Sequence, residues 1–188
     1  QAIELNPNYA DSHSNLGNLL TEIGKLEEAE LSTRKAIELN PDCADAYFNL
    51  SFLELLKGNY QDGLKNYEFR FKKKEPLSIH GNPAIKKINS LNLTKAEKLL
   101  VVSEQGLGDT LQYMRYIPYL RSQGLNISFS AQTKLHSLIQ SSRIDSNVLT
   151  PEQAEIISEG KWIPLLSLPK YLQISPKNPI ITEPYIFS

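Results

Sequence analysis

The chain has 188 residues and a net charge of −1, and 40% of its residues are hydrophobic. This length allows two small domains with modest cores, and the charge balance gives no reason to expect a nucleic acid partner. Residues 1–71 hold 12 Asp/Glu and 6 Lys/Arg, whereas residues 72–188 hold 9 and 14, which suggests two units with different partners. The single cysteine, Cys43, excludes an internal disulfide and favours a reducing compartment. Because there is no signal peptide and no apolar run near the ~18 residues that span a bilayer, we predict a cytoplasmic protein without a membrane span.

The first part of the chain repeats itself. Residues 1–16 return as residues 35–50, and both copies contain Ala-Ile-Glu-Leu-Asn-Pro followed by Ala-Asp. The offset between the copies is the period of the tetratricopeptide (TPR) repeat, a pair of antiparallel helices. We therefore expect helix pairs over about residues 10–39 and 44–72, with residues 1–72 forming TPR repeats that recruit a protein partner. Small residues allow the helices of each pair to approach closely: Gly17, Ala29, Ser51 and Gly63.

Both ends of this helical region depart from the repeat. The chain opens inside the last turn of a preceding repeat, so we expect an uncapped apolar face around Ala2, Ile3 and Leu5 that supports self-association. At the other end, residues 66–72 are more aromatic than a TPR helix requires. This segment is either a closing helix that packs on the next domain or an ordinary solvated capping helix.

Residues 73–97 lack lasting periodicity and are rich in turn formers, which predicts a linker. The lysines at 72–74 and 86–87 fit either a solvated linker or an anion-binding patch. His13, His80 and His136 are interpreted as structural residues.

The next stretch predicts the first βαβ unit of a Rossmann-like domain over residues 98–188. Residues 99–102 are a short apolar run typical of a buried parallel strand. From about Asp109, apolar residues recur at helical spacing until Gly124, and residues 126–131 then alternate as the next strand. Further on, the pattern predicts a helix at 134–140, a short strand at 147–149 and a helix at 151–158, before an apolar segment at 162–169.

The loop Glu104-Gln-Gly-Leu-Gly-Asp109 connects the first strand to its helix. It lacks the third glycine of a dinucleotide fingerprint and the Gly-Lys-Ser/Thr of a P-loop. Gly106 and Gly108 would allow a tight backbone path. Asp109 stands at the start of the helix, where it acts either as a helix cap or as a general base that activates a substrate hydroxyl.

Residues 104–120, with Pro164-Leu-Leu-Ser-Leu-Pro169, Glu183-Pro-Tyr185 and Tyr67-Glu-Phe-Arg-Phe71, resemble the TPR-containing glycosyltransferase-like proteins of bacteria. These are similar to heptosyltransferases, glycosyltransferase family 9, which have the two-domain GT-B fold. The resemblance implies that Asp109 is the catalytic base and that substrate is bound by the other loop residues: Gln105, Gly106, Gly108 and Thr110. The fusion of TPR repeats to a GT-B enzyme also resembles O-linked N-acetylglucosamine transferase in architecture.

The same resemblance implies a sugar acceptor and a nucleotide-sugar donor as substrates. Because the donor site of GT-B enzymes lies mainly on the C-terminal half, we expect this chain to hold only the acceptor half and to be inactive alone. The sequence shows neither an Asp-x-Asp motif nor a metal-ligand cluster, so we predict no metal and no other cofactor. The alternative is a non-catalytic TPR module for protein–protein interaction.

Overall fold

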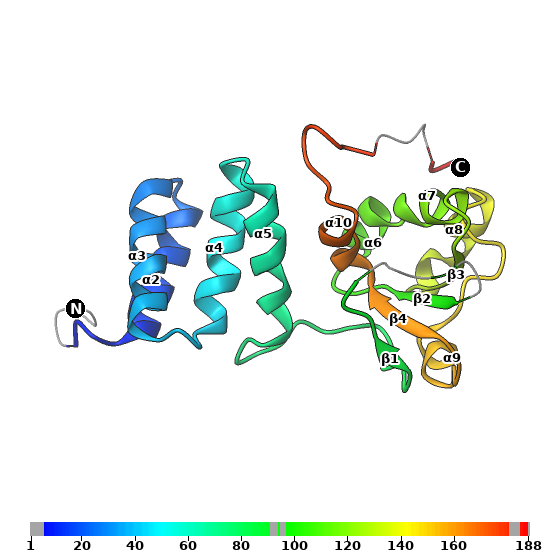
Figure 1. The fold of residues 1–188 in the computed structure, drawn as a ribbon, viewed down its shortest axis with the longest axis horizontal. Helices are drawn as coiled ribbons and strands as arrows, with labels where there is room; N and C mark the ends of the chain where they lie inside the picture. The colour runs from blue at the N-terminus through cyan, green and yellow to red at the C-terminus, as the bar shows by residue number, and fades with distance from the viewer. Residues whose placement is uncertain (1–5, 91–93, 95–96, 181–184, 188) are drawn as a thin grey trace. The chain divides into compact units, whose positions relative to one another are not determined.

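The computed structural model describes residues 6–90, 94, 97–180 and 185–187. The chain divides into two compact units, residues 1–77 and residues 78–188. The first unit is helical and the second contains a parallel sheet (Figure 1). The division falls inside residues 73–97, the segment that the sequence predicts as a linker. Residues 1–5, where we expect the uncapped apolar face, lie outside the described residues.

The helical unit consists of α2 (Ala10–Glu22), α3 (Leu26–Leu39), α4 (Ala44–Leu56), α5 (Tyr60–Tyr67) and a 3₁₀ turn, η1 (Glu68–Phe71). The predicted helix pairs are confirmed. The helices α2 and α4 have the same length, and each boundary of α4 lies one repeat period after that of α2. The turns before α3 and α5 contain Gly24 and Gly58, which are also one period apart and have positive φ (78° and 82°). Glycine adopts this left-handed conformation without the steric penalty of a side chain.

The helices pack closely because small residues lie between them. A Cβ added to Gly17 on α2 would lie 2.1 Å from Thr33 Oγ1 and 3.2 Å from the Ala29 carbonyl oxygen, both on α3. A Cβ added to Gly63 on α5 would lie 2.8 Å from Leu55 Cγ on α4. These positions therefore hold glycine because the facing helix leaves no room for a side chain. The core beside them includes Ala29, Leu50 and Leu53.

The aromatic segment at the end of the helical unit packs within that unit. The rings of Tyr47 and Phe69 stack with centroids 4.3 Å apart. The Arg70 side chain is fully buried, lies over the rings of Tyr67 and Phe71, and forms an ion pair with Glu68 at 2.8 Å. Burial of this guanidinium is tolerated because it has both an anionic and an aromatic partner.

The sheet unit has four parallel strands in the order β1-β4-β2-β3: β1 (Lys86–Lys87), β2 (Lys98–Val102), β3 (Asn126–Ser130) and β4 (Lys161–Pro164). The predicted parallel pairing of residues 99–102 with the strand near 126–131 is confirmed, with Leu99 opposite Ile127 and Val101 opposite Phe129. β2 is central, and its residues from Leu99 to Val102 are buried. β1 lies within the segment expected to be a linker.

Helices cover both faces of this sheet (Figure 1). They are α6 (Leu107–Tyr113), α7 (Tyr116–Ser122), α8 (His136–Ser141), α9 (Pro151–Glu155) and α10 (Leu168–Tyr171), with 3₁₀ turns η2 (Thr133–Leu135) and η3 (Leu165–Ser167). On one face, Leu100, Val102 and Trp162 form a buried cluster with Ala154 of α9. The other face carries the alternate residues Leu99 and Val101 of β2 and is covered by α7, which contacts β3 (Figure 1). This α/β arrangement is what the Rossmann-like prediction requires in outline.

Three predicted elements differ in detail from the observed ones. The single helix expected from Asp109 to Gly124 is two helices, because Pro118 has no N–H to donate to the Met114 carbonyl and its ring crowds that carbonyl. The strand expected at 147–149 is only an isolated bridge between Ser130 and Leu149. The helix expected at 151–158 ends at Glu155, and a capping box with Thr150 and Gln153 defines its start.

Candidate functional site

The carboxyl edge of the parallel sheet presents the loop that the sequence singles out. This loop follows β2 and leads into α6, and its conformation depends on Gln105, which has a φ of 60°. Such a left-handed backbone costs a non-glycine residue roughly 1–2 kcal/mol, so the surroundings must hold it in place. His80 Nε2 donates a hydrogen bond to the Gln105 carbonyl oxygen at 2.7 Å, and Gln105 N donates to the Ser78 carbonyl oxygen at 3.3 Å. The loop is thus fixed by the segment that precedes β1.

Asp109 caps the helix that starts at this loop. Its carboxylate Oδ2 accepts a hydrogen bond from the Gly106 backbone N–H at 3.0 Å, which is the backward half of a capping box. The side chain is half-buried. A carboxylate offers about four lone-pair sites, so this single bond leaves acceptor capacity for another donor.

Neither glycine of the loop, Gly106 or Gly108, has the positive φ that would require a glycine at its position. Gly106 has φ −84° and ψ 168°, and a Cβ added to it would lie 3.2 Å from Asp109 Oδ2. A Cβ added to Gly108 would meet no atom within 4 Å. The unusual conformation of the loop therefore belongs to Gln105.

A second polar segment reaches the same edge after β3. Thr110, which is fully buried, donates from Oγ1 to Gln132 Oε1 at 2.8 Å, and Gln132 Nε2 donates to the carbonyl oxygens of Gln105 and Gly106 at 3.4 Å. The carboxyl ends of adjacent parallel strands meet at one edge of a sheet. The position of Gln132, shortly after β3, could therefore have been anticipated from the sequence.

A shallow cavity of about 450 Å³ lies beside this loop. Of the five predicted site residues, Gln105 and Gly106 line it, whereas Gly108, Asp109 and Thr110 are not among its lining residues. Sequence reasoning missed most of its wall. The lining residues are His80, Gln105, Gly106, Leu107, Gln132, Thr133, Lys134 and Pro151.

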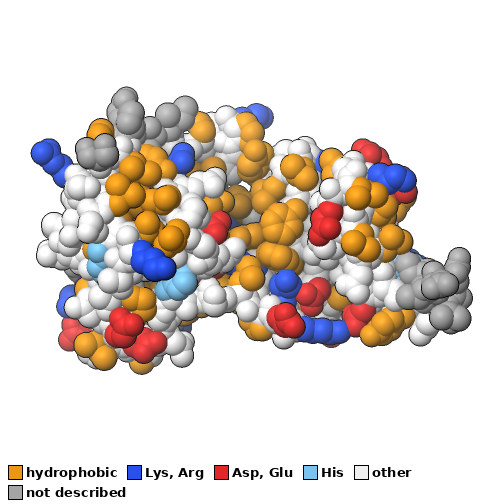
Figure 2. Space-filling model, turned by 180° about the vertical axis from the view of Figure 1, so that it is seen from behind, with side chains coloured by type: hydrophobic (Ala, Val, Ile, Leu, Met, Phe, Trp, Pro, Cys, Tyr) orange, Lys and Arg blue, Asp and Glu red, His pale blue; other side chains and the backbone are white. Residues whose placement is uncertain are grey.

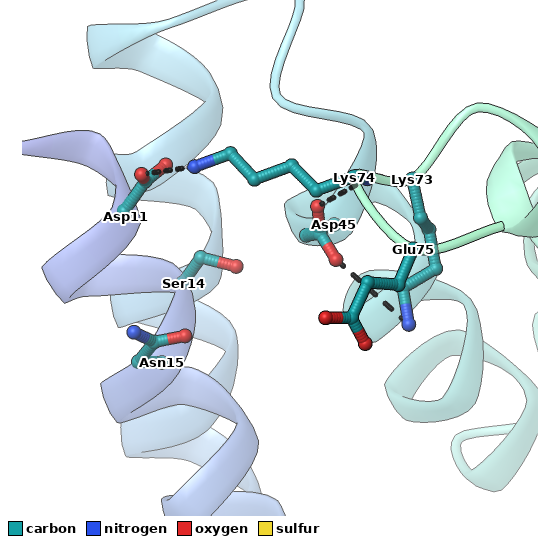
Figure 3. Close-up of a pocket in the computed structure, with 7 residues that line it drawn as sticks. All are labelled: Asp11, Ser14, Asn15, Asp45, Lys73, Lys74 and Glu75. Carbon is teal, nitrogen blue, oxygen red and sulfur yellow. Dashed lines mark hydrogen bonds and ion pairs between the residues drawn. The ribbon is translucent and has the colours of Figure 1, made fainter.

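A second cavity, of about 260 Å³, lies in the helical unit (Figure 3). We call it the TPR groove; it is lined by Asp11, Ser14 and Asn15 of α2, Asp45 of α4, and Lys73, Lys74 and Glu75. The contact between the two repeats extends into the groove, since Asn49 Nδ2 of α4 donates to the carbonyl oxygen and the hydroxyl of Ser14 at 3.2 Å. The groove thus lies where α2 and α4 meet.

Two lysines project into the TPR groove. Lys74 Nζ donates to Asp11 Oδ2 at 2.5 Å, and Lys73 Nζ lies 3.8 Å from Asp45 Oδ1 (Figure 3). The hydrogen bond from Lys74 lowers the pKa of Asp11, and that carboxylate in turn raises the pKa of Lys74. Because these lysines are paired with aspartates, the anion-binding interpretation of the basic run does not fit residues 73 and 74.

The histidines and acidic residues offer no metal centre in the described ranges. There, no group of three or more His, Cys, Asp or Glu side chains is arranged to hold a metal ion. Each histidine instead donates a ring N–H to a backbone carbonyl, His13 to Pro7, His80 to Gln105 and His136 to Ala131. In the same part of the chain, no helix has both the length and the apolar character needed to cross a bilayer.

Comparison with known proteins assigns part of the helical unit. Residues 10–43 match the tetratricopeptide repeat family, a range that covers α2 and α3. No curated protein sequence matches the chain. The second helix pair repeats the first at the same period, and a repeat of this kind indicates a surface for protein–protein interaction.

Proposed function

We propose that the helical unit binds an extended segment of a protein partner in the TPR groove. One observation carries this proposal: α2 and α4 are equivalent helices of two successive repeats, and the equivalent residues Asp11 and Asp45 line the same cavity. Stacked helical repeats characteristically present such surfaces to their partners. On the face drawn in Figure 2, hydrophobic side chains of the described residues gather in patches, with charged side chains mostly around them.

Selection from a random peptide library on the immobilised chain tests this proposal. Enriched peptides are expected to bind more weakly to the variant Asn15→Arg, which places a long side chain in the groove from an exposed helical position. The matched control is Asn18→Arg on the same helix, because Asn18 is exposed and is not among the residues that line the groove. Equal binding to both variants would place the peptide site elsewhere.

We propose further that the sheet unit forms the acceptor side of a GT-B-like sugar-transfer cleft. The support is the carboxyl-edge cavity, since ligands of open α/β sheets bind outside the carboxyl ends of the strands. In this proposal Asp109, which does not line the cavity but accepts a hydrogen bond from the lining residue Gly106, takes the proton of the acceptor hydroxyl through its remaining lone pairs. Gln105, Gly106, Gly108 and Thr110 shape the loop against which the acceptor is held.

The donor side of the reaction requires a second domain. GT-B transfer holds the donor diphosphate on one domain and the acceptor hydroxyl on the other, and this positioning supplies roughly 7–11 kcal/mol of the barrier reduction. We therefore expect residues 1–188 to be inactive alone and to bind nucleotide sugars negligibly. The alternative is a non-catalytic interaction module. The hydrogen bond between the Gly106 N–H and the Asp109 carboxylate favours this alternative, because it gives Asp109 a structural role as a helix cap.

Nuclear magnetic resonance separates these two functions of the sheet unit. Titration with a panel of mono- and oligosaccharide acceptors is expected to shift the amide signals of Gln105, Gly106 and Gln132, which line the cavity. A panel that leaves these signals unchanged would refute an acceptor site there. Micromolar binding of a nucleotide sugar, measured by calorimetry, would show that the donor site lies in this unit and that the assignment of the half-domain is wrong.

A further inference from the structure

The TPR groove carries a carboxylate at the same position of each repeat. Asp11 is the second residue of α2 and Asp45 is the second residue of α4, so the two lie one repeat period apart in the sequence. Both line the groove (Figure 3). The spacing of these two negative charges is therefore set by the packing of one repeat on the next.

The chain itself supplies a ligand for this pair of carboxylates. Lys74 binds Asp11 through Nζ at 2.5 Å, and Lys73 Nζ lies 3.8 Å from Asp45. The Lys74 backbone N–H also donates to Asp45 Oδ2 at 3.4 Å. Two consecutive basic residues thus engage two successive repeats, and the later residue reaches the earlier repeat. The groove accordingly holds a basic segment that runs antiparallel to the order of the repeats.

The part of this internal contact that Lys74 makes is open to exchange with solvent, whereas the Lys73 side chain is only 21% exposed. The Lys74 side chain is 74% exposed, and ion pairs between exposed groups contribute little net stability because water competes for both charges. Lys73 also contacts the Phe48 ring, with Nζ 4.6 Å from the centroid. The cavity beside the lysines remains large enough to admit further side chains.

The charge of the helical unit favours the same kind of ligand. Residues 1–77 hold 13 acidic and 9 basic residues, and an excess of one sign attracts segments of the opposite sign and raises their association rate. An acidic or neutral peptide that displaced Lys73 and Lys74 would leave the two aspartates without a basic partner.

We propose that the TPR groove binds an extended partner peptide with two adjacent lysine or arginine residues, and that Lys73 and Lys74 are an internal competitor that this peptide displaces. This inference rests on the proposed protein-binding function and names the chemistry of the partner. Asp11 and Asp45 each bind one basic side chain of the peptide. Because the peptide binds only molecules in which the lysines have left the groove, its apparent affinity is the intrinsic affinity multiplied by the fraction of such molecules.

Fluorescence polarisation with a labelled short peptide tests the proposal. The peptide carries a central Lys-Lys pair between Gly, Ala and Ser residues, and the matched peptide carries Gln-Gln. If the internal lysines occupy the groove in about four molecules of five, the variant Lys73→Gln/Lys74→Gln binds the Lys-Lys peptide about fivefold more tightly than the parent chain. Lys74→Gln alone gives an effect in the same direction and, since this side chain is exposed, is expected to keep the fold.

The acidic pair is then tested on the lysine-free background. Adding Asp11→Asn and Asp45→Asn is expected to weaken binding of the Lys-Lys peptide about fivefold or more, because two ion pairs are lost. Asp42→Asn is the matched control, since it removes the same charge from an exposed turn of the same unit outside the groove. Circular dichroism verifies that each variant has the helical content of the parent.

Three results would overturn the inference: equal affinity of parent and lysine variants, equal affinity for the Lys-Lys and Gln-Gln peptides, or an equal effect of Asp42→Asn. If peptides from the random library bind in a groove-dependent way without adjacent basic residues, only the dibasic inference fails. If no library peptide binds at all, the proposed protein-binding function fails with it.

Discussion

The close contact of α2 and α3 at Gly17 gives a quantitative test of the helical packing. In Gly17→Ala, the added Cβ would lie 2.1 Å from Thr33 Oγ1, far inside van der Waals contact. Replacing glycine by alanine in a helix interior gains about 1 kcal/mol in helix propensity, whereas overpacking of a well-packed core costs about 1–3 kcal/mol. Because the Ala29 carbonyl oxygen is also only 3.2 Å from the new atom, we expect the cost to exceed the gain. The predicted net loss in the free energy of unfolding is up to about 2 kcal/mol.

Urea denaturation followed by circular dichroism at the helical signal measures this loss, and a second substitution identifies its cause. The Thr33 hydroxyl is buried and has no hydrogen-bond partner among the described residues, so Thr33→Ala removes the clashing atom without breaking a bond there. The double variant Gly17→Ala/Thr33→Ala should therefore recover most of the lost stability, which a double-mutant cycle reports as coupling. A Gly17→Ala chain as stable as the parent, or a double variant no more stable than Gly17→Ala, would refute the reasoning.

Three further predictions concern charge, capping and association. Burial raises the pKa of Glu54, so its charged form destabilises the fold above that pKa and the penalty disappears as the pH falls below it. Glu54→Gln should therefore stabilise the helical unit near neutral pH and have a smaller effect in acid, which thermal melts at each pH measure. In a protein that also has a donor-binding half, Asp109→Asn should reduce sugar transfer by at least about 100-fold. Melting curves should stay close to those of the parent, because the Asn side-chain oxygen can still accept the hydrogen bond from the Gly106 N–H. Unchanged transfer would show that Asp109 acts only as a helix cap. Leu19 on α2 is 58% exposed, and Ile23, just after α2, is 68% exposed. Light scattering should therefore show concentration-dependent association of the parent chain that the variant Leu19→Lys/Ile23→Lys abolishes. A strict monomer of the parent at high concentration would contradict this.

The sequence predicts the parts of the fold that depend on local periodicity. A repeat with glycine and proline at fixed positions leads to α2–α5 because both copies must meet the same packing demands. The parallel pairing of β2 and β3 follows similarly from an apolar strand, a helix and a second strand. The break near Met114 is also predictable in principle, since Pro118 lies within the predicted helix, but the apolar spacing around it favours one continuous helix.

The remaining features depend on contacts between segments distant in the sequence. β1 is very short and has no periodicity, and it is a strand only because β4 pairs with it. His80 reaches the carboxyl-edge cavity from the segment before β1, for which the sequence gives no signal. From the sequence alone, the run of lysines indicates a solvated or anion-binding segment. Its pairing with Asp11 and Asp45 depends on the packing of the two repeats, which the sequence around the lysines does not show.

The strand order β1-β4-β2-β3 has a consequence for the order of folding events. β4 is made last but lies between β1 and β2, so β1 has no partner in the sheet until β4 has been synthesised. During translation, β2 and β3 can pair first and bury one side of β2, whereas the other side stays open until residues 161–164 leave the ribosome. Pairings between strands so far apart in the sequence form slowly because a long loop must close first. A nascent chain that ends before β4 would therefore expose one unpaired edge of the central strand β2, the kind of edge that chaperones and aggregation partners recognise.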